Sequence, residues 1–237
     1  VTPTPSYVGE MLHIDVFSTD KKFFLTCIDK FSKFAVVQHI PSRTIIDLKG
    51  PIIQLMNIFP HTENIYYDNE PSLKSETIMS LLRDQFNVKV ENAAPLHSTS
   101  NGQVERFHST LSEIARCLKL EKKMVSTVDL ILLATIKYNR TIHSITNKRP
   151  IDIFQFSSSE LREEIKEKIS KAQQTVLNRN NASRQNRTFE VGESVLVKNN
   201  KRLGNKWTPL YSEETIEADL GTTVLIRGRV VHKDNIR

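Results

Sequence analysis

The sequence predicts an α/β protein, with a mixed five-stranded sheet flanked by helices, followed by a long helix and a small β-rich module. Three observations predict this class. Residues 11–90 alternate short aromatic and β-branched runs with runs whose apolar residues recur at helical spacing. Residues 160–180 form a charged run with a narrow apolar stripe, which is typical of a surface or bundling helix. Residues 188–237 contain short strand-like runs separated by turns.

The predicted sheet begins with an antiparallel meander. Its three strand-like runs are separated by turn residues and are rich in β-branched and aromatic side chains: Met11–Phe17, Phe23–Asp29 and Phe34–Ile40. A helix follows over Thr44–Phe59, where apolar residues recur at helical spacing. Gly50-Pro51 interrupts this pattern and leaves open a split into two helices.

The rest of the first domain alternates strands and helices. Strands are expected at Ile65–Asp68 and Val88–Val90, and helices at Ser72–Phe86, Gln103–Leu120 and Val128–Ile142. A polar loop, Asn92–Gly102, precedes the second of these helices. Three strands, then a helix, a strand, a helix, a strand and two helices indicate a mixed sheet with helices on its faces.

A charged helix over Glu160–Asn180 and a small β-barrel complete the expected chain. The polar run Asn178–Arg187 breaks the helical pattern and is a candidate boundary. Strands at Ser194–Lys198, Glu214–Ala218 and Thr222–His232 fit a small barrel. We therefore divide the chain into an N-terminal tether (1–8), a core (9–155), a linker helix (156–187) and a C-terminal domain (188–237).

Composition narrows the classes of protein. The net charge is +6, and it is uneven: residues 1–110 carry 10 basic and 12 acidic side chains, whereas residues 111–237 carry 23 and 15. This asymmetry favours a polyanionic partner for the later half, although a solvated basic surface remains an alternative. Two distant cysteines exclude a disulfide framework and a cysteine-based zinc site, and they favour a reducing, intracellular setting. The longest apolar run, residues 130–136, is too short to span a bilayer.

Three carboxylates stand at unusual positions. Asp15 lies inside a strand, where aspartate is disfavoured, Asp68 ends the strand after the first helix, and Glu105 lies in the first turn of a helix. Each has a plain structural alternative: a bond to a neighbouring loop, an Asx-turn, or a favourable place in the helix dipole. Together at one sheet edge they would repel one another, which makes most sense if divalent cations lie between them.

These residues resemble a known family. The runs LHIDVF around Asp15, YYDNEPS around Asp68 and SNGQVERFH around Glu105 look like the Asp-Asp-Glu triad of retroviral integrases, and they are most similar to those of Ty3/gypsy-type LTR retrotransposons. KYNRTIHSITNKRP matches the same group. The resemblance implies an RNase H-like core and an SH3-like C-terminal domain. Asp68 and Glu105 are separated by 36 residues, one more than is usual in the family. The family's N-terminal zinc module is absent, so we expect the chain to be a fragment.

The resemblance also implies the chemistry. It predicts metal-dependent 3′-end processing and strand transfer of element DNA into host DNA by in-line phosphoryl transfer. Asp15, Asp68 and Glu105 would hold two Mg²⁺ or Mn²⁺ ions when DNA is bound. The expected partners are the LTR ends, target DNA, further copies of the chain in a dimer or tetramer, and chromatin, but no membrane. The expected locations are the nucleus and, before integration, a virus-like particle.

Several polar residues are candidates for contact with DNA. By resemblance, His97, Asn101 and Gln103 would hydrogen-bond the DNA end beside the active site. Arg106 would reach a phosphate or brace Glu105, and a surface ion pair is its structural alternative.

A second set lies in the basic run of the C-terminal domain, which is a candidate phosphate contact: Lys198, Lys201, Arg202 and Lys206. An ordinary soluble loop is the alternative for this run.

Two other functions remain open at this stage. One is an RNase H-like nuclease that only hydrolyses DNA, for which the linker helix and basic module would be unnecessary. The other is a domesticated, non-catalytic DNA- or chromatin-binding protein, which predicts loss of a carboxylate. All three carboxylates are present here.

Overall fold

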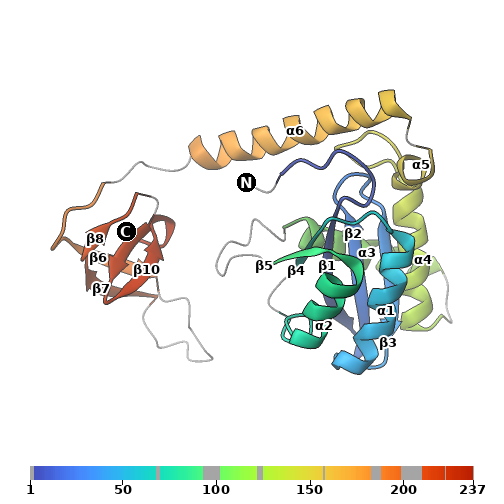
Figure 1. Cartoon of the computed structure of the whole chain (residues 1–237), viewed down its shortest axis with the longest axis horizontal. Helices are drawn as coiled ribbons and strands as arrows, with labels where there is room; N and C mark the ends of the chain where they lie inside the picture. Colours follow the sequence, from blue (N-terminus) through green and yellow to red (C-terminus); the bar gives the residue numbers. More distant parts are fainter. Residues whose placement is uncertain are drawn as a thin grey trace. The chain divides into compact units, whose positions relative to one another are not determined.

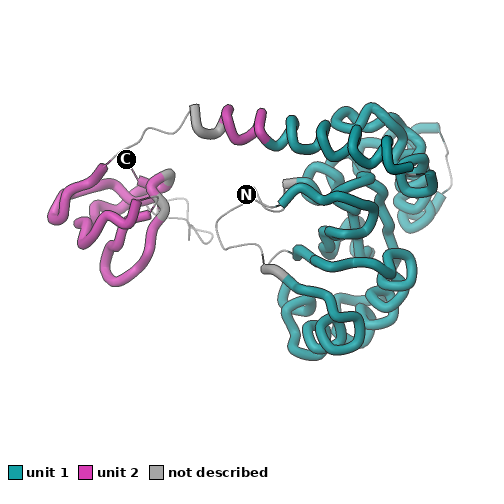
Figure 2. The backbone as a smooth tube through the Cα atoms, turned by 45° about the horizontal axis from the view of Figure 1, so that its top comes forward, with its two compact units in different colours: residues 1–173 teal, residues 174–237 magenta. Residues whose placement is uncertain are grey.

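The computed structural model describes residues 3–67, 70–92, 102–121, 125–156, 158–182, 188–198, 210–221 and 223–236. The chain divides into two compact units, residues 1–173 and residues 174–237, each of which is described by itself (Figure 2). The division falls within the long helix α6 (Ser159–Ala182). The finer division into tether, core, linker and C-terminal domain stays a prediction.

The larger unit contains the predicted mixed sheet, with strands in the order β3-β2-β1-β4-β5 (Figure 1). β1 (Met11–Thr19), β2 (Lys22–Asp29) and β3 (Ala35–Ile40) form the expected antiparallel meander. β4 (Asn64–Tyr67) runs parallel to β1, and β5 (Lys89–Asn92) runs parallel to β4. The turn between β1 and β2 places Asp20 and Lys21 at positive φ, a geometry that matches the twist of a two-residue hairpin.

Helices cover both faces of this sheet (Figure 1). One face packs against α1 (Ile45–Ile58) and α2 (Glu76–Ser80), which continues into a π-helical turn. The other face packs against α3 (Gly102–Glu121) and α4 (Thr127–Arg140). The alternation of side chains along β1 explains this arrangement, because Leu12, Ile14 and Val16 enter the first core, while the residues between them face α3 and α4.

Helix α1 settles an alternative that the sequence left open, and two other helices differ from the sequence predictions. Helix α1 is continuous through Pro51, because burial of residues on both sides of the proline, including Leu48 and Ile52, outweighs one lost backbone hydrogen bond. Helix α2 begins at Glu76 rather than four residues earlier, since the Ser75 hydroxyl caps it by accepting the Ile78 N–H. The short helix α5 (Pro150–Gln155) was not predicted.

The first part of α6 belongs to the larger unit and is buried against it. Ile165 and Ile169 pack with Phe31, which follows β2, and with Ile153 of α5. This stripe is the apolar face that the sequence predicted, and its burial explains why the helix begins on the core. Within the described ranges, no helix combines the length and the hydropathy needed to cross a bilayer.

The smaller unit is built from short antiparallel strands around one apolar core. β6 (Ser194–Lys198) pairs with β7 (Tyr211–Thr215), while β8 (Ala218–Asp219), β9 (Thr223–Ile226) and β10 (Arg229–His232) form a second sheet, followed by a 3₁₀ turn (Lys233–Asn235). The predicted strand over Thr222–His232 is instead a hairpin, because the chain turns at Arg227-Gly228 with positive φ at both residues. The SH3-like assignment stays a prediction.

Candidate active site

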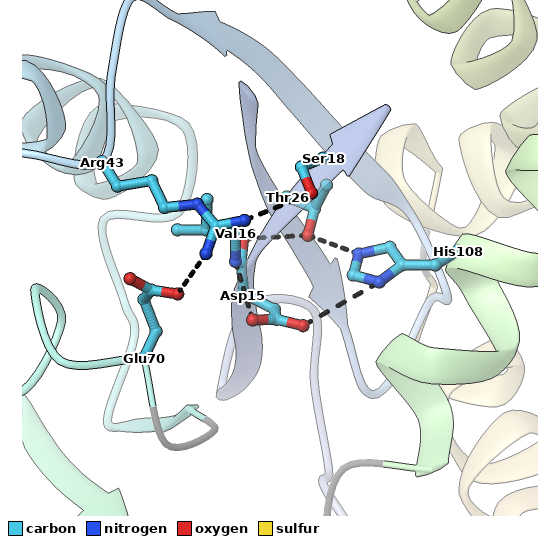
Figure 3. Close-up of polar contacts among 7 residues, drawn as sticks. All are labelled: Asp15, Val16, Ser18, Thr26, Arg43, Glu70 and His108. Atoms are coloured by element: carbon cyan, nitrogen blue, oxygen red, sulfur yellow. Dashed lines mark hydrogen bonds and ion pairs between the residues drawn. The ribbon is translucent and has the colours of Figure 1, made fainter. Parts of the chain in front are cut away.

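Asp15 lies in the middle of β1, on the face that α3 covers, and its side chain is 20% exposed. Its Oδ1 accepts a hydrogen bond from the backbone N–H of Val16 at 2.7 Å (Figure 3). A strand interior disfavours aspartate, and burial of a carboxylate opposes ionisation. Partial exposure at this position therefore leaves a rigidly held carboxylate that solvent or a ligand can reach.

Two residues from distant parts of the chain meet at Asp15. Thr26 lies opposite Asp15 in the β1–β2 register, and its hydroxyl donates to the Asp15 carbonyl at 3.0 Å. The same hydroxyl lies 2.8 Å from Nε2 of His108, a residue of α3 (Figure 3). The other ring nitrogen of His108, Nδ1, lies 3.8 Å from Oδ2 of Asp15. Strand β2 and helix α3 therefore hold the two ends of one short polar network around this carboxylate.

The imidazole of His108 is neutral at neutral pH. Burial lowers its pKa to about 4, because desolvation disfavours the charged form. The ring packs against Phe17, with 4.8 Å between the ring centroids, and against Phe107. These aromatic contacts fix the ring plane beside Asp15.

Helix α3 brings Glu105 to the same neighbourhood. Its buried stripe of Val104, Phe107 and Leu111 packs on the sheet, which leaves Glu105 exposed. Glu105 and His108 are three residues apart and so lie on the same side of the helix. Glu105 is therefore one helical turn from the residue that faces Asp15.

The second predicted carboxylate, Asp68, lies outside the described residues. It follows Tyr67, the last residue of β4, and Tyr67 pairs with Ile14, the neighbour of Asp15, in the parallel register. The convergence of all three carboxylates therefore stays a prediction. Among the residues that the structure describes, no three His, Cys, Asp or Glu side chains form a metal-binding group, but Asp68 is not part of that set.

The donor set nevertheless suits a hard divalent cation. Asp15 and Glu105 supply carboxylate oxygens, which Mg²⁺ and Mn²⁺ prefer, and both side chains are accessible to solvent. The Val16 N–H donates to Oδ1 of Asp15 and so orients one oxygen of this carboxylate.

Gln103, a predicted contact with DNA, makes a contact within the protein. Its Oε1 accepts from Nζ of Lys33 at 3.4 Å, and its Nε2 is buried with no hydrogen-bond partner among the described residues. Lys33 is only 4% exposed, and it also donates to the Lys30 carbonyl at 2.7 Å. Burial lowers the pKa of Lys33 to about 8. The first turn of α3 is thus tied to the turn after β2, and binding to DNA by the Gln103 amide stays a prediction.

The other predicted contacts with DNA are only partly within the described residues. Arg106 is exposed on α3, and Lys198 is exposed at the end of β6.

Burial, together with the nearby charges of Lys33 and Arg106, lowers the pKa of His143 to about 4.

Five predicted contacts with DNA lie outside the described part of the chain: His97, Asn101, Lys201, Arg202 and Lys206.

A second polar network joins the end of β1 to the segment that follows β4. Arg43 donates to the Ser18 hydroxyl at 3.2 Å and approaches Glu70 at 3.5 Å, and its guanidinium lies 5.0 Å from the centre of the Phe23 ring (Figure 3). Glu70 stands two residues after Asp68 in the sequence. Nothing in the sequence pattern pairs Arg43 with Glu70.

His108 lies within the SNGQVERFH motif but had no predicted role, and Thr26 was not among the predicted site residues. The signal for His108 was its place three residues after Glu105 on a helix. The signal for Thr26 was absent, because only the strand register places it opposite Asp15.

Comparisons with known proteins agree with this fold. No protein-family model matches the chain. The whole chain is 62% identical, over 236 residues, to the retrovirus-related Pol polyprotein from transposon gypsy of Drosophila melanogaster, and it spans 23% of that protein. It is 35% identical to the Pol polyprotein from transposon opus of the same species, of which it spans 25%. The chain thus corresponds to about a quarter of these relatives.

Solved structures share the fold at low sequence identity. A simian T-cell lymphotropic virus intasome in complex with the PP2A regulatory subunit B56 gamma matches with a TM-score of 0.66 and 11% identity, over 99% of this chain and 80% of that one. The catalytic core domain of HTLV-2 integrase in complex with magnesium, in a trimeric form, matches with a TM-score of 0.54 and 16% identity, over 63% of this chain and 98% of that one.

The larger unit therefore has the RNase H-like fold of a retroviral integrase catalytic core. Over its whole length the chain is similar to one segment of the gypsy-type retrovirus-related Pol polyproteins, as the sequence resemblance indicated.

Proposed function

We propose that this chain is the integrase of a gypsy-type LTR retrotransposon, a polynucleotidyl transferase that processes the 3′ ends of element DNA and joins them to host DNA. The observation that supports this most directly is the place of Asp15. A partly exposed carboxylate in the central strand of an integrase fold, beside the helix that carries Glu105, is suited to metal-dependent phosphoryl transfer.

The carboxylates would act as the cation-binding group. Asp15, Asp68 and Glu105 together carry a charge of −3, so two divalent cations leave a residual positive charge for a DNA phosphate. Bound Mg²⁺ or Mn²⁺ supplies electrostatic stabilisation to the attacking and leaving oxygens. The protein's own contribution is orientation, because β1 and α3 are rigid elements that fix Asp15 and Glu105 before DNA arrives. The magnesium complex of the HTLV-2 core supports Mg²⁺ as one of the ions used.

DNA would be held by groups around these carboxylates and by the smaller unit. His97, Asn101, Gln103 and Arg106 are the candidates near the active site. Replacing several phosphate counterions with lysine and arginine side chains would make binding depend strongly on salt.

In the smaller unit the candidate contacts are its basic residues: Lys198, Lys201, Arg202 and Lys206.

The assembly and location follow from the proposed reaction. Two DNA ends must be inserted together, so one chain with one active site is insufficient and a homo-oligomer is required. The trimeric form of the HTLV-2 core and the simian virus intasome support assembly of this kind. Host DNA as target implies action in the nucleus, on chromatin, after release from a virus-like particle.

The test is metal-dependent joining of a duplex that ends in the element's terminal sequence to a plasmid, by the purified chain with Mg²⁺ or Mn²⁺. A branched DNA that already contains the joined strands provides a parallel substrate, because its reversal requires a single active site. We expect activity in at least one of these assays, and loss of that activity in Asp15→Asn and in Glu105→Gln.

Glu113→Gln is a matched control, since Glu113 is an exposed acid of the same helix that pairs with the surface residue Arg116. Hydrolysis of DNA without any joining would favour the nuclease that only hydrolyses. DNA binding without either reaction, with both metals and both substrates, would favour a non-catalytic DNA- or chromatin-binding protein. Joining that persists in Asp15→Asn would overturn the site assignment.

A further inference from the structure

The first two turns of α3 have a second polar side, next to the side that carries Glu105. Gln103 and Arg106 are three residues apart and therefore lie on the same side of the helix. The Gln103 amide oxygen accepts from Nζ of Lys33 at 3.4 Å, so this side of α3 faces the turn after β2. Arg106 is exposed there, whereas Lys33 is buried.

The loop after α4 reaches the same region. Tyr138 of α4 packs edge-on against Phe107 of α3, with 4.9 Å between the ring centroids. His143, in the loop after α4, packs edge-on against Tyr138 with 6.4 Å between the centroids. Burial is the main cause of the low pKa of His143, and the charges of Lys33 and Arg106 lower this pKa further. Both of these neighbouring charges are positive.

No carboxylate in the described part of the chain forms an ion pair with either cation. Lys33 donates to the Lys30 carbonyl at 2.7 Å and to the Gln103 amide. Arg106 has no side-chain hydrogen bond or ion pair within the described ranges, although a surface ion pair was its structural alternative. Two cations close together without an acid between them favour an anionic ligand.

His143 adds a hydrogen-bond donor whose direction is fixed by the backbone. Its Nδ1 accepts the Ile145 N–H at 3.2 Å. A backbone N–H can only donate, so Nδ1 has a lone pair and the ring proton is on Nε2. Among the described residues nothing accepts this proton, and Nε2 is not one of the enclosed polar atoms. The Nε2–H group is therefore available to a ligand.

A phosphate of DNA is the anion that matches these groups. Guanidinium groups bind phosphate oxygens through two parallel hydrogen bonds, and a neutral imidazole N–H can donate one more. We propose that Arg106 and Nε2 of His143 form a subsite for a DNA backbone phosphate beside the active site, with Lys33 as a fixed positive charge behind it. This inference rests on the proposed function, because Arg106 directly follows Glu105 in α3.

The first test compares two substitutions of His143. His143→Asn keeps an acceptor for the Ile145 N–H but removes the Nε2 donor, whereas His143→Gln keeps a donor near Nε2 and loses that acceptor. Affinity for the labelled branched DNA is measured by fluorescence anisotropy in EDTA, so that no metal contributes. We expect a loss of about 10-fold in His143→Asn and a smaller loss in His143→Gln. The reverse order, or equal losses, would overturn the proposal, since a purely structural ring would need Nδ1 more.

Arg106 is tested through the salt dependence of the same binding. Arg106→Gln should reduce the salt slope by about 1, because one phosphate contact is lost. Arg116→Gln, at an exposed arginine of the same helix that pairs with Glu113, is the matched control and should keep the slope. Thermal unfolding of each variant verifies folding. An unaltered slope in Arg106→Gln would contradict the phosphate contact.

The last test identifies the phosphate without depending on protein folding. A neutral methylphosphonate is placed in turn at each phosphate on either side of the joined one in the branched DNA. We expect one position to weaken binding by the wild-type chain, and this loss to shrink in His143→Asn, because the contact is already missing there. Equal losses in the two proteins at every position would overturn the subsite.

These outcomes separate the subsite from the proposed function. If the wild-type chain joins DNA but no phosphate is coupled to His143, the subsite is wrong while the proposed function stands. If inorganic phosphate shifts the ¹⁵N signals of the His143 ring and no DNA phosphate is coupled to it, the site takes a small anion and the proposal is overturned. If the chain neither binds nor joins DNA, both fail.

Discussion

The buried lysine behind α3 leads to a testable dependence of stability on pH. Lys33 is 4% exposed, lies close to the buried carboxylate of Asp29, and links the turn after β2 to Gln103. Burial lowers its pKa from 10.5 to about 8, although the charge of Asp29 opposes this change. We predict that Lys33→Met removes a rise in stability that the wild-type chain shows between pH 7 and pH 9.5.

The sign and size follow from proton linkage. The unfolded chain holds the lysine proton up to its ordinary pKa of 10.5, whereas the folded chain releases it near pH 8. The unfolded state thus binds more protons between these values, so the free energy of unfolding rises with pH in this window. Integrating from pH 7 to pH 9.5 gives about 2 kcal/mol for this one group. Other groups, such as Lys30 and Cys27, contribute to both proteins and largely cancel in the comparison.

The assay is urea unfolding at both pH values, followed by the circular dichroism of the helices. The wild-type chain should gain about 2 kcal/mol more than Lys33→Met over this interval. Lys49→Met, at an exposed lysine of α1, should retain the wild-type dependence. Identical pH dependence of stability in Lys33→Met and wild type would refute the reasoning, because it would mean that the folded chain does not release the Lys33 proton near pH 8.

Three further predictions concern other parts of the chain. Arg43→Met should cost less than about 1 kcal/mol of stability, since the ion pair between Arg43 and Glu70 is partly exposed. On the hypothesis that this ion pair orients the segment after β4, the substitution should also weaken Mn²⁺ binding. Unchanged Mn²⁺ affinity would mean that the ion pair is a surface contact only. Ile169→Ala should lower the unfolding free energy by about 2–4 kcal/mol, while Val176→Ala, exposed on the same helix, should change it little; equal effects would contradict packing of α6 on the core. Replacing Lys201 and Arg202 with glutamine should weaken binding evenly across DNA sequences and reduce the salt slope by about 2, and an unaltered slope would exclude phosphate contacts there.

Much of the fold could be predicted from side-chain patterns within single elements. The meander and the parallel strands follow from runs of β-branched residues, and α3 follows from apolar residues at helical spacing. The hairpin between β9 and β10 was missed because Arg227-Gly228 is a weak turn signal, and the arginine adopts positive φ only because the strands on both sides pair. Helix α5 was missed because six residues give too short a period to detect.

The candidate site likewise contains residues that the sequence predicts and contacts that it does not. Asp15 stands out in the sequence because a strand interior disfavours it, and Glu105 because of the motif around it. The contact between Thr26 and His108 joins residues 82 positions apart and depends on the strand register and on the packing angle of α3. Neither the strand register nor the packing angle of α3 can be predicted from a local sequence pattern. The contact between Lys33 and Gln103 is a similar case, because it depends on where the turn after β2 ends.

Helix α3 connects the stability of the larger unit with its proposed chemistry. Its position is fixed by a buried stripe that includes Phe107, and by the Lys33–Gln103 contact at its first turn. A cation shared by Asp15 of β1 and Glu105 of α3 would join these two elements, so binding would stabilise the folded chain by about 2.7 kcal/mol at a concentration 100 times the Kd. By the same linkage, a substitution that lets α3 move away from β1 would weaken binding of this cation, even where it touches neither carboxylate.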